Sequence, residues 1–225
     1  MPRRVGLMTV SAIKATVLGM ALALPMMGCV NTGASAKGEL PPMRWDHRPE
    51  ASIWTTQALA AVDAHPAGLP DVIPADIATW CPGYATATED EREAFWVGLM
   101  SALAKHESTW NPRASGGGGA WIGLLQISPA TARHYGCEAR TSAALKDGAA
   151  NLDCAVRIAS VQVARDGMVA GNGARGMGSD WAPFRNSSKR ADMSAWTRAQ
   201  SYCQKKERNV LFGAMTPPKA ANAAG

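Results

Sequence analysis

The most regular pattern of apolar and polar positions in the chain lies between Thr88 and Asn111. Thr88 and Glu91 have the spacing of a capping box, which satisfies backbone N–H groups at the start of a helix. Apolar residues then recur every three or four positions, and Asn111-Pro112 ends the helix because a residue before proline resists helical geometry. The pattern predicts a long buried helix, whose apolar lines contain Phe95, Leu99, Ala102 and Leu103, and Trp96, Met100 and Leu103.

Helical spacing marks other segments as well, whereas the alternation typical of strands is nearly absent. A short helix is predicted within residues 50–64, a core helix around residues 152–163 and a last helix around residues 193–203. Ser128-Pro129 has the residues of a helix start. Four consecutive glycines, 116–119, forbid a regular helix and predict a loop.

These elements predict one compact, mainly α domain over residues 50–213, with a Gly-rich loop in its middle. The segment 29–49 is polar and contains prolines, so we expect a flexible tether there. The tail 214–225 has little to bury and is predicted to be disordered.

Residues 1–28 have the pattern of a bacterial export signal: two arginines, then an apolar run of 13 residues that is short for a membrane span. Met26-Met27-Gly28-Cys29 resembles a lipobox, with methionine in place of the usual leucine, and predicts a lipid on Cys29. Cleavage after Ala36, at an A-x-A site, is the alternative and would give a secreted protein without an anchor. We expect a periplasmic protein, anchored to the outer membrane in the first case.

Export changes the interpretation of the remaining cysteines, Cys81, Cys137, Cys154 and Cys203. An even number in an oxidising compartment predicts two disulfides, with three possible pairings. Cys137–Cys154 would brace a loop of about 17 residues and contribute about 3 kcal/mol. Cys81–Cys203 would tie the two ends of the domain together. We expect this pairing rather than 81–137 with 154–203 or 81–154 with 137–203, which would leave that loop unbraced.

Charge and composition exclude several classes of function. The net charge is +5, but the first 36 residues carry three basic residues and no acid, so 20 basic residues face 18 acidic ones in the remainder. That balance is not typical of a nucleic-acid-binding surface. The four histidines are scattered and no CxxC pair occurs, so neither a metal site nor a cofactor is expected. Membrane contact is expected only through the lipid anchor, and the chain is expected to be a monomer.

Glu107 is the residue that breaks the apolar pattern, because it lies four positions after Leu103 on a buried line of the helix. A carboxylate held there is costly to ionise, and desolvation raises its pKa. A carboxyl group that stays protonated near neutral pH is what a glycosidase needs to protonate a leaving oxygen. A helix-end glutamate that extends to solvent is the structural alternative.

The residues around Glu107 add a family resemblance. Glu107-Ser108-Thr109-Trp110-Asn111-Pro112, then Gly123-Leu124-Leu125-Gln126-Ile127, then Pro129-Ala130-Thr131-Ala132, resembles the soluble lytic transglycosylase family over about 26 residues. Asn151-Leu152 is similar to the start of a later family helix. The resemblance implies an α+β, lysozyme-like fold and cleavage of peptidoglycan glycan strands, with Glu107 as the single catalytic acid/base.

The resemblance also implies roles for other residues. Gln126 would bind N-acetyl or hydroxyl groups of the sugars, and Ser115 corresponds to a loop serine of the family. The family's A-Y-N-A-G motif is missing, and Trp181 is predicted to take over its sugar-lining role. Trp121 is left open between packing and sugar contact, while Trp110 and His106 are interpreted as structural.

Three functional hypotheses follow. The first is an exported lytic transglycosylase that acts on the bond between N-acetylmuramic acid and N-acetylglucosamine and forms a 1,6-anhydro product. The second is a hydrolase similar to goose-type lysozyme, with Asp180 as a second carboxylate. The third is a non-catalytic wall-binding or secretion-associated protein, which the missing A-Y-N-A-G motif favours.

Overall fold

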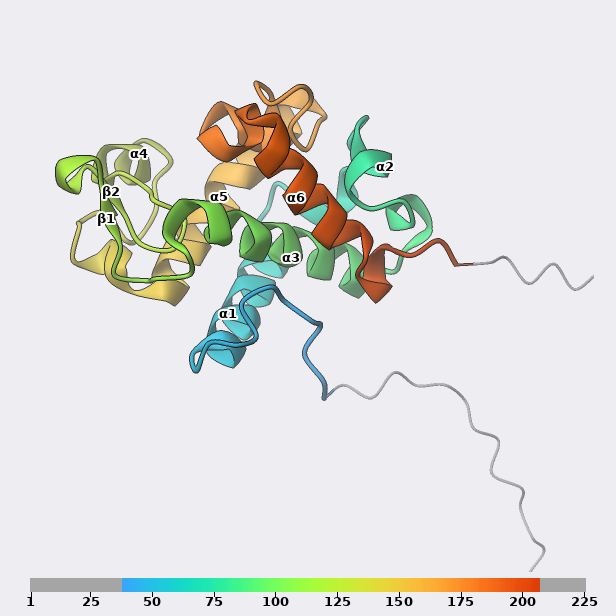
Figure 1. Cartoon of the computed structure of the whole chain (residues 1–225), viewed down its shortest axis with the longest axis horizontal. Coiled ribbons are helices and arrows are strands. Elements are labelled where there is room, and N and C mark those ends of the chain that lie inside the picture. Colours follow the sequence, from blue (N-terminus) through green and yellow to red (C-terminus); the bar gives the residue numbers. More distant parts are fainter. Residues whose placement is uncertain (1–37, 207–225) are drawn as a thin grey trace, which may run out of the picture. The chain divides into compact units, whose positions relative to one another are not determined.

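The computed structural model describes residues 38–206 (Figure 1). The predicted export signal, Cys29, the alternative cleavage position after Ala36 and the predicted disordered tail lie outside the described residues. Within them, no helix combines the length and the apolar character needed to cross a membrane.

The described part of the chain is mainly helical, which confirms the predicted fold class. Its two strands, β1 (Ser115–Gly116) and β2 (Trp121–Ile122), form a small antiparallel hairpin in the Gly-rich loop. The α-helices are α1 (Ala51–Ala64), α2 (Ile77–Trp80), α3 (Glu89–Ser108), α4 (Pro129–His134), α5 (Gly148–Asp166) and α6 (Ser187–Arg198).

Helix α3 is the centre of the domain (Figure 1). The predicted capping box is present: the Thr88 hydroxyl accepts the backbone N–H of Glu91, whose carboxylate accepts the N–H of Thr88. Every residue from Ala94 to Ala104 is buried, because α1 and α6 pack on α3 and the turns next to it cover the remaining sides. Helix α5 packs on α1, and its Asn151 forms hydrogen bonds with the backbone of Ile122 and Leu125, just after the four glycines.

The segment before α1 is packed against the domain, although the sequence predicts a tether up to residue 49. Met43 and Trp45 are 4% and 0% exposed, and the Trp45 indole N–H donates to the Thr55 hydroxyl at 2.9 Å. The Arg44 backbone N–H donates to the Ser101 hydroxyl of α3 at 2.9 Å. Two large apolar residues in a polar stretch give no periodicity, so their burial could not be recognised from the pattern.

Two disulfides join the elements in the pairing expected from the sequence. Cys137–Cys154 links the end of the α4 region to α5 across 17 residues, with the Cα atoms 5.1 Å apart. Cys81–Cys203 links the residue after α2 to the C-terminal 3-10 turn across 122 residues, with a Cα separation of 4.6 Å. Helix α3 lies within the loop that the second disulfide closes. This disulfide joins the segment before α3 to the C-terminal end of the described domain.

Loop length predicts different contributions from the two disulfides. We expect the double variant Cys137→Ser/Cys154→Ser to lower the free energy of unfolding by about 3 kcal/mol, and Cys81→Ser/Cys203→Ser by almost 5 kcal/mol, because the longer loop restricts the unfolded chain more. Urea unfolding of both variants measures the difference. Equal losses would contradict the loop-entropy explanation.

Candidate active site

Glu107 lies in the last turn of α3, where the helix stops abruptly. Thr109 and Trp110 both have left-handed backbone conformations, with φ values of 53° and 56°. Such values are strained for residues with a side chain, above all for β-branched threonine. Trp110 stabilises the turn, because its indole N–H donates to the Ser101 carbonyl at 2.9 Å. The helix therefore ends just after its acidic residue and leaves the carboxylate at the edge of the core.

The Gly-rich loop forms a second wall. Gly117 has φ 54°, and a Cβ atom there would lie 2.2 Å from the Trp121 ring. A Cβ atom on Gly116 would lie 2.5 Å from the side-chain oxygen of Gln126. Glycine at these two positions therefore gives Trp121 and Gln126 room to lie directly against the loop backbone.

Asn151 fixes the segment that carries Gln126. Its side chain is fully buried; the amide oxygen accepts the Leu125 N–H at 2.9 Å, and the amide nitrogen donates to the carbonyls of Ile122 and Leu145, both at 3.0 Å. From the opposite side, the Trp181 indole N–H donates to the Leu125 carbonyl at 2.9 Å. The loop is thereby held between α5 and the segment before α6.

These walls enclose a cavity of about 340 Å³. Of the residues predicted from the sequence, Glu107, Gln126 and Trp181 line it together, whereas Ser115 lies on β1 and is not part of the lining. Arg185, for which the sequence predicted no role, also lines the cavity, and so does Trp121, whose role the sequence left open. The full lining is Glu107, Trp121, Gln126, Asp180, Trp181, Ala182 and Arg185.

The two lining tryptophans differ in accessibility. Trp181 is only 3% exposed and its one donor is used by Leu125, so it forms a rigid floor. Trp121 is 52% exposed and presents an open aromatic face. An exposed aromatic ring on a constrained loop is a suitable platform for the apolar face of a sugar ring.

Burial raises the pKa of Glu107 to about 7, and the charge of Lys189 opposes this effect. No side chain or backbone group within residues 38–206 forms a hydrogen bond with the carboxylate. The group is thus poised to be protonated at or below neutral pH and to ionise without breaking an existing bond.

Asp180, the other carboxylate in the cavity, is in a different environment. One of its oxygens accepts hydrogen bonds from the Tyr135 hydroxyl at 3.0 Å and from the Gln162 amide. The Tyr135 hydroxyl also accepts a hydrogen bond from the Gln162 amide. Burial, together with the nearby Asp180, raises the pKa of Tyr135. Asp180 therefore acts as an anchored hydrogen-bond acceptor beside the freer Glu107.

The cavity thus combines a desolvated carboxyl group at the end of a buried helix with a facing glutamine loop and tryptophan walls. Residues 85–165 match the family model of the transglycosylase SLT domain, which confirms the resemblance seen in the motifs around Glu107.

Solved structures of Bd0314 DslA are similar to this chain. A mutant with glutamate replaced by glutamine is 29% identical, with a TM-score of 0.66 over 73% of this chain and 98% of that chain. A wild-type form is 28% identical, with a TM-score of 0.66 over 74% and 100%. No curated protein matches the chain. The SLT domain supports peptidoglycan cleavage of the lytic transglycosylase type, which takes place at the cell wall.

The raised pKa of Glu107 predicts how Glu107→Gln changes stability with pH. The unfolded carboxyl ionises near its model value of 4.5 and the folded one near 7, so the wild type loses stability between these values and the uncharged variant does not. We expect the stability of the variant relative to the wild type to increase from pH 4 to pH 8, by on the order of 1–2 kcal/mol after allowance for solvent screening.

Glu93→Gln is the matched control on the same helix. Burial, together with Asp63, Asp90 and Glu89, raises the pKa of Glu93 to about 7 as well, yet Glu93 does not line the cavity. Chemical denaturation across this pH range should give both variants the same direction of change. A difference from the wild type that is constant or falls with pH would refute the buried-acid interpretation of Glu107.

Proposed function

We propose that this protein is a lytic transglycosylase that cleaves the β-1,4 bond between N-acetylmuramic acid and N-acetylglucosamine in peptidoglycan, with Glu107 as its single acid/base. The observation that carries the proposal is the carboxyl group of Glu107, which lines the cavity, is desolvated and has a pKa of about 7. At neutral pH, such a group is present in both protonation states in comparable amounts, as a residue that first donates and then accepts a proton requires.

In the first step, protonated Glu107 donates its proton to the glycosidic oxygen, and the bond from that oxygen to C1 of the muramic acid breaks. The positive charge that develops at C1 is stabilised by the N-acetyl group of the same sugar. Substrate assistance of this kind is a known exception to the use of two carboxylates. We assign Gln126, which lines the cavity on its braced loop, to binding of the acetamide or a neighbouring hydroxyl.

In the second step, ionised Glu107 accepts the proton of the O6 hydroxyl of the same muramic acid. O6 forms a bond to C1 and closes a 1,6-anhydro ring, and the carboxyl group returns to its protonated form. No water enters the product. We assign the exposed face of Trp121 and the buried floor of Trp181 to binding of the sugar rings on this strand.

A hydrolase is the second candidate function, and Asp180 is the observation that favours it. Asp180 lines the same cavity as Glu107, and one of its oxygens has no partner within the described residues. A carboxylate in this position could orient a water molecule toward C1. The anchoring of its other oxygen by Tyr135 and Gln162 supports a binding role instead.

The location that fits this function is outside the cytoplasm. We propose that residues 1–28 direct export, that Cys29 carries a lipid which anchors the protein to the outer membrane, and that the catalytic domain acts as a monomer in the periplasm. The two disulfides support an oxidising compartment.

Activity of Glu107→Gln on purified sacculi tests the assignment. We expect release of soluble glycan fragments to fall by at least 100-fold, because a positioned acid/base typically contributes that much, while Glu93→Gln retains wild-type activity. Wild-type activity should decrease as pH rises above about 7, where Glu107 loses the proton that it must donate.

Mass spectrometry of the products separates the two enzymatic candidates. Fragments that end in 1,6-anhydro-N-acetylmuramic acid support the transglycosylase, and they differ by one water from the reducing ends of a hydrolase. Exclusively reducing ends, lost in Asp180→Asn, would replace the proposed reaction by hydrolysis. Full activity of Glu107→Gln would refute both versions of the site.

A further inference from the structure

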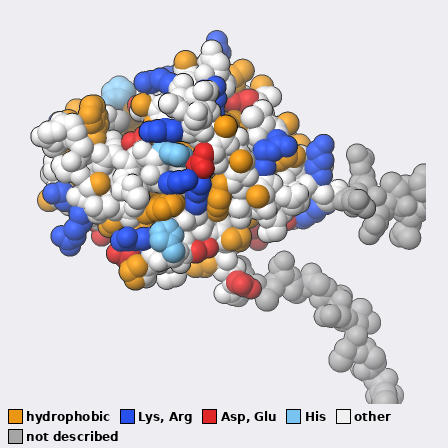
Figure 2. Space-filling view, viewed as in Figure 1, with side chains coloured by type: hydrophobic (Ala, Val, Ile, Leu, Met, Phe, Trp, Pro, Cys, Tyr) orange, Lys and Arg blue, Asp and Glu red, His pale blue; other side chains and the backbone are white. Residues whose placement is uncertain are grey.

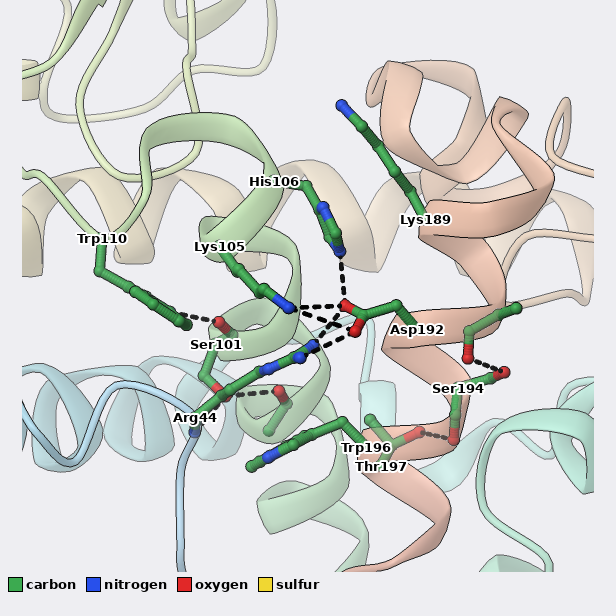
Figure 3. A network of polar contacts seen from close by, with 12 residues as sticks. Arg44, Ser101, Lys105, His106, Trp110, Lys189, Asp192, Ser194, Trp196 and Thr197 are labelled. Carbon is green, nitrogen blue, oxygen red and sulfur yellow. Dashed lines mark hydrogen bonds and ion pairs between the residues drawn. The ribbon is translucent and has the colours of Figure 1, made fainter.

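Basic side chains gather on the face where the last turn of α3 meets α6 (Figure 2). Most of them share one acidic partner, Asp192 of α6 (Figure 3). Its carboxylate accepts two bonds from Arg44, at 2.7 and 3.0 Å, and contacts Lys105 at 3.2 Å and His106 at 2.7 Å. These partners, Arg44 first, hold the pKa of Asp192 well below its usual range. Arg44 and Lys105 therefore share one acidic partner within the fold, and burial lowers the pKa of His106, which favours its neutral form.

Lys189 is the exception. It precedes Asp192 by one turn of α6 but extends away from it, and it forms no hydrogen bond or ion pair through its side chain with any residue from 38 to 206 (Figure 3). A cation in the first turn of a helix is unfavourable, because the helix dipole places positive charge there. Arg190, beside it, has a structural explanation: it donates to the carbonyls of Asn172 and Phe184. Nothing in the fold explains Lys189 in this way.

Arg185 lies four residues before Lys189, in the short turn that precedes α6, and lines the cavity with Glu107. One of its N–H groups donates to the Ser179 carbonyl at 2.6 Å, which orients the guanidinium group. No acidic side chain within the described residues pairs with it. Its remaining donors are consequently free, and a guanidinium group binds a carboxylate strongly through two parallel hydrogen bonds.

We propose that Arg185 and Lys189 form a cationic rim of the cleft that binds a carboxylate of the substrate. The proposal rests on the proposed function, since glycan strands of peptidoglycan carry carboxylates at one place, the lactyl side of muramic acid. Where the stem peptide has been removed, the lactyl group carries a free carboxylate. Where the stem is present, that carboxyl group is an amide and the carboxylates are those of the stem. Arg185 lines the same cavity as Glu107, and Lys189 follows it by four residues, so the rim lies beside the proposed acid.

Asp180, an acidic residue in the same cavity, does not neutralise the positive charge of this rim. Asp180 shares the cavity, but Tyr135 and Gln162 hold one of its oxygens on the side of α5. The cavity thus has an acceptor side at Asp180 and a donor side at Arg185. A muramic acid unit, with hydroxyl and amide donors on its ring and a carboxylate on its lactyl side, matches both.

Binding to full-length protein that carries Glu107→Gln tests the rim without cleavage and without the effect of Lys189 on Glu107. Three tetrasaccharides serve as probes in calorimetry: neutral chitotetraose, a muramic acid glycan with free lactyl carboxylates, and the same glycan with tetrapeptide stems. We expect Arg185→Gln and Lys189→Gln each to weaken binding of an acidic probe by about 5- to 30-fold, as the loss of a charge-assisted bond implies, and to leave chitotetraose unchanged. A loss for the free-lactyl probe alone assigns the lactyl carboxylate, a loss for the stem-bearing probe alone assigns a carboxylate of the stem, and a loss for both shows that the rim accepts either carboxylate on the lactyl side.

Lys146→Gln is the matched control, because Lys146 is an exposed cation that does not line the cavity. It should bind all three probes like the parent. Wild-type cleavage of sacculi, together with unchanged affinity of both rim variants for the acidic probes, would overturn the rim and leave the proposed function intact. A chain that neither cleaves sacculi nor binds any of the probes would overturn the proposed function and the rim with it.

Discussion

Helix α3 is buried without interruption from Ala94 to Ala104, and the remainder of the structure depends on this burial. A helix surrounded by packed side chains brings its last turn to the edge of the core instead of into bulk water. Glu107 therefore stands at a boundary, where its charge is poorly solvated but its oxygens still reach the cavity. The left-handed turn at Thr109 and Trp110 follows from the same constraint, since the chain must leave the core at once to form the opposite wall.

That opposite wall depends on a second buried polar group, the amide of Asn151. Its three hydrogen bonds all go to backbone groups, those of Ile122 and Leu125 on one segment and that of Leu145 on another. Both the oxygen and the nitrogen of the amide therefore have partners. A buried amide whose bonds are all made defines one geometry, because each alternative leaves a buried polar group without a partner. Gly123 contributes to the same arrangement: a Cβ atom there would lie 2.4 Å from the Asn151 amide nitrogen, so the chain can pass Asn151 only without a side chain.

The sequence predicted those features that depend on local rules. The capping box, the periodicity of α3 and the position of Glu107 on its buried line are all local, and they were recognised together with the mainly α fold. The packing of Met43 and Trp45 escaped prediction because it joins residues to partners far along the chain. Arg185 and the exposure of Trp121 escaped for a related reason. Which side chains face a cavity depends on the path of a glycine loop and of 3-10 turns, whose geometry no periodicity encodes.

The features that form the site also lower the stability of the folded domain. An ionised Glu107 lowers the free energy of unfolding at neutral pH, and each strained residue in the turn after it costs on the order of 1–3 kcal/mol. These costs are local, whereas the two disulfides act on the unfolded chain and stabilise the domain without touching the cavity. A domain stabilised in this way can keep an unpaired, desolvated acid and a strained turn at its centre. Pairing Glu107 with a neighbouring cation, as Asp192 is paired with Arg44, would relieve its desolvation but would also fix it in the ionised form. Within the described residues Glu107 has no such partner, and its carboxyl group can therefore be protonated and ionised without breaking an ion pair.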